Sequence, residues 1–174
     1  MDTSRAGRLA LTLFLGIYGF RLLQHPDMGS LMDSIDLPIH ETGHLVFSPF
    51  GDFMQFLGGT LFQVIVPCVF VGYFLMRGDR HSASVTLWWV AQNFWNISVY
   101  VKDARNQDLE LVGGGEHDWA YILGHMGWLK QDQIIAHRVW VVGVILYVVA
   151  IAGGLFALNA ASAKPVNSAE AFAA

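Results

Sequence analysis

The sequence from residue 38 to residue 44 reads Pro-Ile-His-Glu-Thr-Gly-His and contains a His-Glu-x-x-His motif. On a helix, residues four positions apart lie on one face, so His40 and His44 can both direct a ring nitrogen at one metal ion. Glu41 follows the first histidine, where its carboxylate can take a proton from a water activated by that metal. The motif therefore predicts a zinc site with Glu41 as the general base.

The setting of the motif favours a functional interpretation over a chance match. Two histidines and a glutamate inside an apolar run are costly unless they are paired or bind a ligand. We expect a helix over residues 37–47, with Pro38 in its first turn and Asp36 as the N-cap. The alternative is that this short motif arose by chance, as short motifs do.

Catalytic zinc usually has three protein ligands and one open position, so a third ligand must come from another segment. The acidic and histidine cluster at Glu116, His117 and Asp118 is the densest remaining set of donors. We expect Asp118 to be the third ligand, with His117 as the alternative, although Asp118 could instead cap the helix after it. His125 is either a partner behind the ligands or a core histidine. The single cysteine, Cys68, lies in an apolar run and is expected to serve packing.

The composition is that of a membrane protein. Of 174 residues, 54% are hydrophobic and 14% are charged, and the mean hydropathy is +0.44. The net charge of −4 offers no basic surface for nucleic acid, so the lipid bilayer is the expected partner. We expect one transmembrane domain over residues 1–158 and a disordered, Ala- and Ser-rich tail over residues 159–174.

The apolar segments predict an all-α, polytopic membrane bundle with about four full spans and two short or re-entrant helices. The expected spans cover residues 9–23, 53–76, 82–101 and 139–158. The short helices are the motif helix and residues 119–129, which we expect to pack on the motif helix. Small residues at Gly58 and Gly59 would let a neighbouring helix approach closely. The first span lacks a cleavage site and is expected to be retained, in a bacterial cytoplasmic (inner) membrane.

Three amides lie within the expected spans and must find polar partners there. Asn93 and Asn96 share one face of their helix, and Gln63 lies in the preceding span. Such groups face the interior of the bundle or a cavity. They are candidates for binding the substrate or its developing oxyanion, and the alternative is hydrogen bonding between helices alone.

The motif helix resembles that of the site-2 protease group of intramembrane zinc metalloproteases. The histidine ligands of that group match His40 and His44, its general base matches Glu41, and Gly43 stands before the second histidine as is common there. The following Gly-x-x-x-Asn/Ser/Gly element is similar to residues 59–63, with Gln63 in place of Asn. The third element of the group, Asn-x-x-Pro-x-x-x-Leu-Asp-Gly, has no counterpart, and Gly-Glu-His-Asp, ending at residue 118, stands in for it.

This resemblance covers roughly residues 35–130 and implies a zinc metalloprotease. Its substrate would be a peptide or transmembrane protein, cleaved in or beside the bilayer. Two alternatives remain from the residues themselves. The chain could be an inactive, protease-like subunit of a membrane complex, or it could be a haem- or iron-binding membrane protein, since it has seven histidines.

Overall fold

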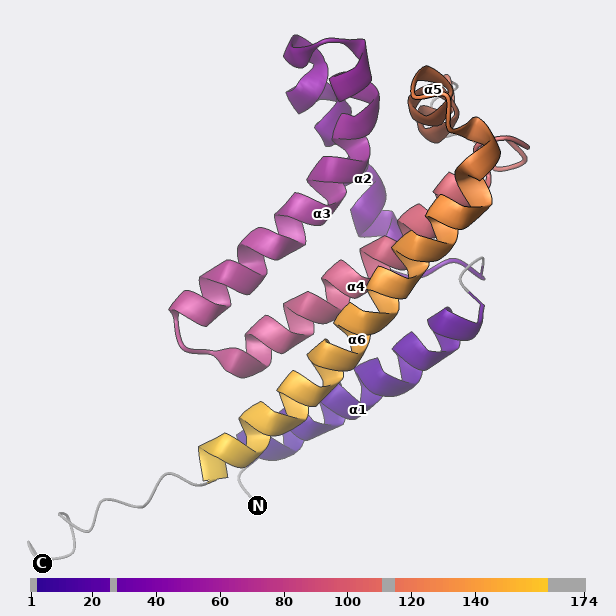
Figure 1. Cartoon of the computed structure of the whole chain (residues 1–174). Helices are drawn as coiled ribbons and strands as arrows, with labels where there is room; N and C mark the ends of the chain where they lie inside the picture. Colours follow the sequence, from indigo (N-terminus) through magenta and orange to yellow (C-terminus); the bar gives the residue numbers. More distant parts are fainter. Residues whose placement is uncertain (1–2, 26–27, 111–114, 163–174) are drawn as a thin grey trace, which may run out of the picture.

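The computed structural model describes residues 3–25, 28–110 and 115–162, and every regular element in these ranges is helical (Figure 1). Within these ranges, six α-helices and two short 3-10 helices follow one another. They are α1 (Thr3–Gln24), α2 (Asp33–Phe47), η2 (Ser48–Phe50), α3 (Asp52–Met76), α4 (Arg80–Lys102), α5 (Asp118–His125), η3 (Leu129–Gln131) and α6 (Asp132–Ser162).

Three of these helical segments are long and apolar enough to cross a membrane. They cover α1 from Ser4, all of α3, and η3 with α6 as far as Asn159. Large apolar side chains on each remain exposed, among them Phe14, Val69 and Phe156. Apolar surface of this extent is unfavourable in water and is suited to contact with lipid tails.

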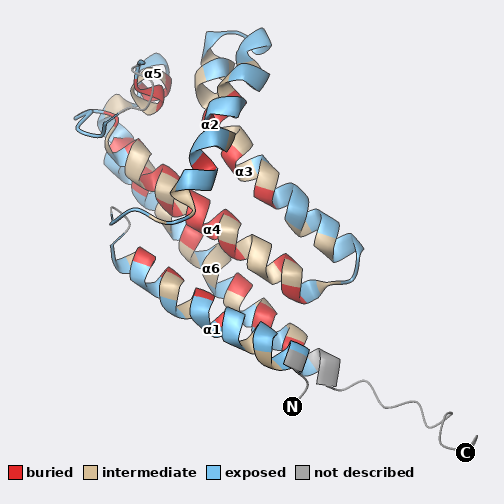
Figure 2. Ribbon diagram, turned by 180° about the vertical axis from the view of Figure 1, so that it is seen from behind, coloured by how far each residue is buried: buried red, intermediate tan, exposed pale blue. Residues whose placement is uncertain are grey.

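The expected fourth span, residues 82–101, is not among these three segments. The corresponding helix, α4, is 23 residues long, but its polar residues exclude it from the segments apolar enough to cross. Those residues are inside the molecule, because α4 packs on α1, α3 and α6 and carries many of the buried segments (Figure 2). A helix covered by other helices can be polar where a lipid-facing one cannot.

The main apolar core fixes α4 between α1 and α6. Trp88 and Trp95 of α4 are buried against Leu15 and Leu22 of α1 and Ala150 of α6. The indole nitrogen of Trp88 also donates to the carbonyl oxygen of Leu15 at 3.0 Å. This packing fixes the position of α4, so polar residues on α4 are held in defined positions.

Tight turns set the direction of α3. Gly51 precedes α3 with φ 92°, and Gly78 follows it with φ 72°, in the left-handed region that glycine enters without strain. Asp79 then caps α4 by accepting from the backbone nitrogen of Ser82 at 3.1 Å. Beyond this turn α3 and α4 diverge, and α2 lies at their open end (Figure 1).

The motif helix begins four residues earlier than expected. α2 starts at Asp33, so Pro38 lies inside it and Asp36 is not its N-cap; Met32 holds that position without a side-chain hydrogen bond. Asp36 is buried, and its Oδ1 atom accepts from the indole nitrogen of Trp89 at 2.7 Å. The carboxylate therefore joins α2 to α4 instead of ending the helix.

Glycines let α2 lie directly against α3. A Cβ atom added to Gly58 would lie 2.6 Å from the Cβ of Phe47 and 2.7 Å from the carbonyl oxygen of Gly43. A Cβ atom on Gly43 would collide in turn with the backbone of Gly58. The expected role of the small residues at the start of the second span is confirmed, and the helix that approaches them is the motif helix.

Two features of the C-terminal half differ from expectation, namely the packing of α5 and the end of α6. The short helix α5 packs mainly on α3, where Tyr121 stacks on Phe56 at 4.0 Å between ring centroids, and it meets the motif helix through Asp118. Aromatic stacking against α3 thus decides its position. α6 continues to Ser162, past the expected domain end at residue 158. The rest of the expected disordered tail, residues 163–174, lies outside the described residues.

Candidate metal centre

Three potential metal ligands from two distant segments come together in the structure. His40 and His44 lie one turn apart on α2, and Asp118 is the first residue of α5, 78 positions after His40. One ligand atom from each lies within 4.8 Å of the others. Among the residues that the structure describes, this is the one such group of three.

The spacing of these atoms suits zinc. The Oδ2 atom of Asp118 lies 3.0 Å from Nε2 of His40 and 3.4 Å from Nε2 of His44. Tetrahedral zinc with ligand bonds of about 2.1 Å holds its ligands about 3.4 Å apart. Two imidazoles and one carboxylate form a usual catalytic ligand set and leave a fourth position for water or substrate.

Both histidines are oriented by hydrogen bonds on their far side. Nδ1 of His40 donates to Oε1 of Gln63 at 3.0 Å, and Nδ1 of His44 donates to the carbonyl oxygen of Gln55 at 2.8 Å. With Nδ1 engaged in this way, Nε2 of each ring faces Asp118 and is the atom available to a metal. Metal-binding histidines are usually held this way.

A series of hydrogen bonds links His40 of α2 to α3, then to α4, and then back to α2. Nε2 of Gln63 donates to Oδ1 of Asn96 at 3.0 Å, and Nδ2 of Asn96 donates to Oδ1 of Asp33 at 3.3 Å. Gln63 and Asn96 were predicted as substrate-binding residues. In the structure, their amides belong to the series of hydrogen bonds that orients His40. Contact of these residues with a substrate stays a prediction.

His117 lies behind Asp118. Its Nδ1 atom accepts from the backbone nitrogen of Ala120 at 3.3 Å, so His117, and not Asp118, caps α5. Its Nε2 atom lies 3.3 Å from Oδ2 of Asp103, and its ring lies 4.2 Å from that of Tyr100. The carboxylate of Asp118 is thereby left to face the two histidines.

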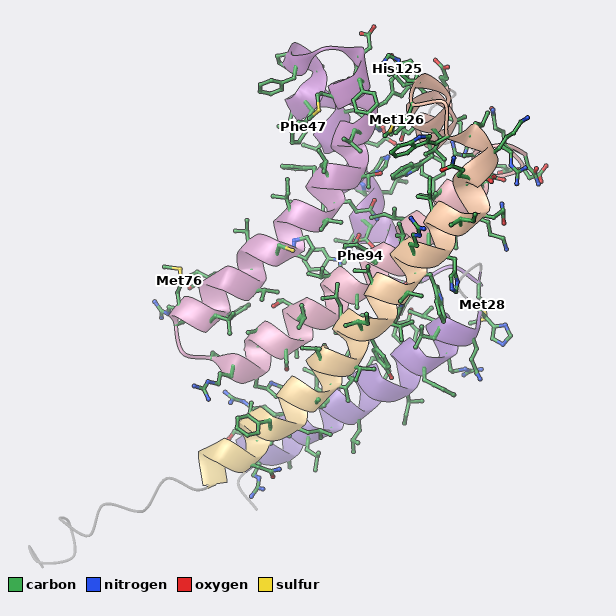
Figure 3. All side chains as sticks on the ribbon, in the orientation of Figure 1. Met28, Phe47, Met76, Phe94, His125 and Met126 are labelled. Carbon is green, nitrogen blue, oxygen red and sulfur yellow. The ribbon has the colours of Figure 1, made fainter. Side chains whose placement is uncertain are left out.

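Two further candidates lie away from the cluster. His125 is exposed at the end of α5, beside the rings of Phe53 and Tyr121 (Figure 3). Asn93 is fully buried, and its amide nitrogen donates to the carbonyl oxygen of Trp89 at 3.1 Å. Neither residue lines the cleft beside the three ligands.

A cleft with a volume of about 720 Å³ adjoins the cluster. His40, Glu41, His44 and Asp118 all line it, and Glu41 lies on the exposed side of α2. The volume is within the range of small-molecule and cofactor sites. The ligands, an acid–base group and room for a substrate therefore share one space.

Sequence reasoning missed several residues of this site. Asp33 and Asp36 share the helix face of His40, because residues 33, 36 and 40 are separated by three and four positions, and this spacing could have identified them. Tyr100 also lines the cleft, and its hydroxyl accepts from the backbone nitrogen of Asp118 at 3.3 Å. Gln55 acts through its backbone carbonyl, for which a sequence has no signal.

The charges of the cluster are coupled when no metal is bound. The hydrogen bond with Asp118 raises the pKa of His44 to about 9. Burial alone would raise the pKa of Asp118, but hydrogen bonds from His40 and His44 outweigh it and hold that pKa below its usual value. The metal-free site is thus a protonated histidine paired with a carboxylate.

We expect zinc affinity to rise with pH. The proton on His44 must leave before Nε2 can bind zinc, so the apparent affinity should increase up to about tenfold per pH unit as pH approaches 9. Chelator-competition titrations at several pH values measure this, and release of about one proton per zinc near neutral pH is the companion result. An affinity independent of pH would contradict the protonated state of His44.

We expect Gly59→Ala to block the metal site while sparing the fold. A Cβ atom at Gly59 would lie 2.5 Å from Nε2 of His40 and 2.7 Å from Nε2 of His44. The rings can swing aside at low cost, but the two nitrogens then no longer converge. Gly72→Ala is the matched control, since it lies in the same helix with nothing within 4 Å of its added Cβ. Zinc stoichiometry and thermal unfolding of both variants check this, and full zinc binding by Gly59→Ala would refute it.

The comparisons with known proteins return no match: no family model, no curated protein and no solved structure is similar to this chain. The resemblance to the site-2 protease group accordingly rests on the residues quoted for it. Function is therefore inferred from the chemistry of the cluster and its cleft.

Proposed function

We propose that this chain is a zinc-dependent metalloendopeptidase that hydrolyses a peptide bond in or near the bilayer. The observation that carries the proposal is the convergence of His40, His44 and Asp118 beside Glu41 in one cleft. A structural zinc site is closed by four protein ligands. Three ligands with an acid–base group next to them are typical of hydrolytic sites.

The residues divide the reaction between them. Bound zinc would act as a Lewis acid that polarises the scissile carbonyl and lowers the pKa of water. Glu41 accepts a proton from the attacking water while the oxygen atom of that water forms a bond to the carbonyl carbon. Glu41 then returns that proton to the amine nitrogen as the carbon–nitrogen bond breaks. Asp118 offsets part of the zinc charge, and Gln63 and Gln55 hold the histidine rings in place.

The position of the centre along α3 supports cleavage near a membrane surface. α3 has 25 residues and is about 37 Å long at 1.5 Å per residue. Its contacts to the two ligand histidines come from Gln55 and Gln63, both in its first half. The site thus lies towards one end of a membrane-crossing helix. A substrate bond there would lie between the middle of the bilayer and its surface.

Metal analysis and reconstitution test the proposal. We expect the purified chain to contain one zinc and to cleave membrane-protein substrates, to lose cleavage on chelation, and to regain it with added zinc. Absence of metal would favour the inactive-subunit alternative. Iron or a haem absorption band would replace the protease proposal with an iron-binding role.

A further inference from the structure

The cleft beside the candidate metal centre is strongly acidic. Six carboxylates line it, and no Lys or Arg is found among the described residues of its lining. The six are Asp33, Asp36, Glu41, Glu110, Glu116 and Asp118. A bound zinc ion would offset only two of these charges, so the cleft keeps a negative potential and concentrates positively charged ligands.

Two buried polar groups in the lining lack partners. Asp36 is 2% exposed, and its Oδ2 atom receives no hydrogen bond, while its Oδ1 atom is used by Trp89. Thr60 is 8% exposed, and its hydroxyl has no hydrogen-bond partner. Buried polar atoms are normally paired, so unpaired ones beside a cleft are placed to bond a ligand or a water molecule in it. An unpaired carboxylate oxygen calls for a donor, and a cationic donor is the strongest.

The acidic groups do not gather around a second metal ion. Among the described residues, only His40, His44 and Asp118 bring three ligand atoms close together. The other carboxylates come from α2 and from the residues before α5, and they are spread along the cleft. An extended ligand with positive side chains matches this spread, whereas one small ion does not.

We propose that the cleft selects polypeptide segments carrying Arg or Lys beside the bond to be cleaved, with Asp36 receiving one of these side chains. The inference rests on the proposed protease function and specifies its substrate class. Burial raises the pKa of Asp36 to about 6 even though Trp89 donates a hydrogen bond to its Oδ1 atom, so a cationic partner at Oδ2 would further stabilise its charge. A guanidinium group there would replace the lost hydration with paired hydrogen bonds.

Binding to a non-cleaving variant tests the inference apart from catalysis. Zinc-loaded, full-length Glu41→Gln protein is titrated with a fluorescein-labelled peptide containing arginine, and with the same peptide containing citrulline. Citrulline keeps the shape of arginine and lacks its charge. We expect the arginine peptide to bind about tenfold more tightly, as a charge-assisted hydrogen bond would give, and added salt to reduce the difference.

Three further variants in this background locate the effect. Asp36→Asn keeps an oxygen for Trp89 and should remove most of the preference for arginine. Glu116→Gln, at an exposed position, should reduce it. Asp108→Asn makes the same charge change outside the cleft and should leave it intact.

Equal binding of the two peptides, or no binding of either, would overturn the inference, as would a preference that survives both Asp36→Asn and Glu116→Gln. Cleavage by the wild-type protein without enrichment of Arg or Lys near the cut sites would likewise refute it, while leaving the protease function in place. Tight, charge-dependent binding without any cleavage by the wild type would refute the protease function and not the acidic binding cleft.

Discussion

Glu41→Gln is expected to retain zinc and to lose hydrolysis by a factor of at least about 10² to 10⁴, the usual contribution of a general acid–base group. Glutamine has nearly the shape of glutamate but cannot accept a proton near neutral pH. Glu41 is also not one of the three clustered ligand residues, so metal binding should survive. Zinc content per chain and the rate of substrate cleavage measure the two effects separately.

The same variant identifies substrates in cells. Membrane-protein fragments that are present with the wild-type protein and absent with Glu41→Gln are products of the site. Asp52→Asn is a suitable control, because it removes an acidic group from the first turn of α3 outside the cleft. Wild-type turnover by Glu41→Gln would show that this residue is not the base.

Removing any of the three ligands should weaken zinc binding by more than about 100-fold. Changes to groups that only orient metal ligands typically cost 10 to 100-fold, so loss of a ligand should exceed that range. His40→Ala, His44→Ala and Asp118→Ala each leave two ligands. Chelator-competition titration of each purified variant gives the affinity.

His117→Ala is the matched comparison for Asp118→Ala. His117 contacts Asp103 and caps α5, so its loss should weaken zinc only through the position of Asp118. A larger effect from His117→Ala than from Asp118→Ala would reverse the assignment of the two residues. Unchanged zinc stoichiometry in His40→Ala or His44→Ala would refute the assignment of a metal site to this cluster.

The parts of the site predictable from the sequence are those fixed by local geometry. The four-residue spacing of His40 and His44 determines their shared face wherever the helix lies. The choice of Asp118 depended on counting donor residues, and the structure brings that carboxylate to the histidines. Long-range placement of this kind follows from how helices pack, which spacing alone does not encode.

The errors in the fold have a common physical origin. Length and partial apolarity made α4 look like a fourth span, but neighbouring helices bury its Gln92 and Asn93, and its Asn96 serves the site. We expected α5 to pack on the motif helix, but it packs mainly on α3 through Tyr121 and Phe56 and meets the motif helix through Asp118. In both cases the environment of a helix depends on which neighbouring helix packs against it. That packing is a property of the folded molecule.

The separation of the ligands along the chain has a consequence for biosynthesis. His40 is made 78 residues before Asp118, and both α3 and α4 are made between them. A nascent chain that ends before α5 holds two of the three ligands and cannot form the complete centre. On the proposed function, the complete centre therefore forms only after α5 has been made, and a growing chain lacks hydrolytic activity until then.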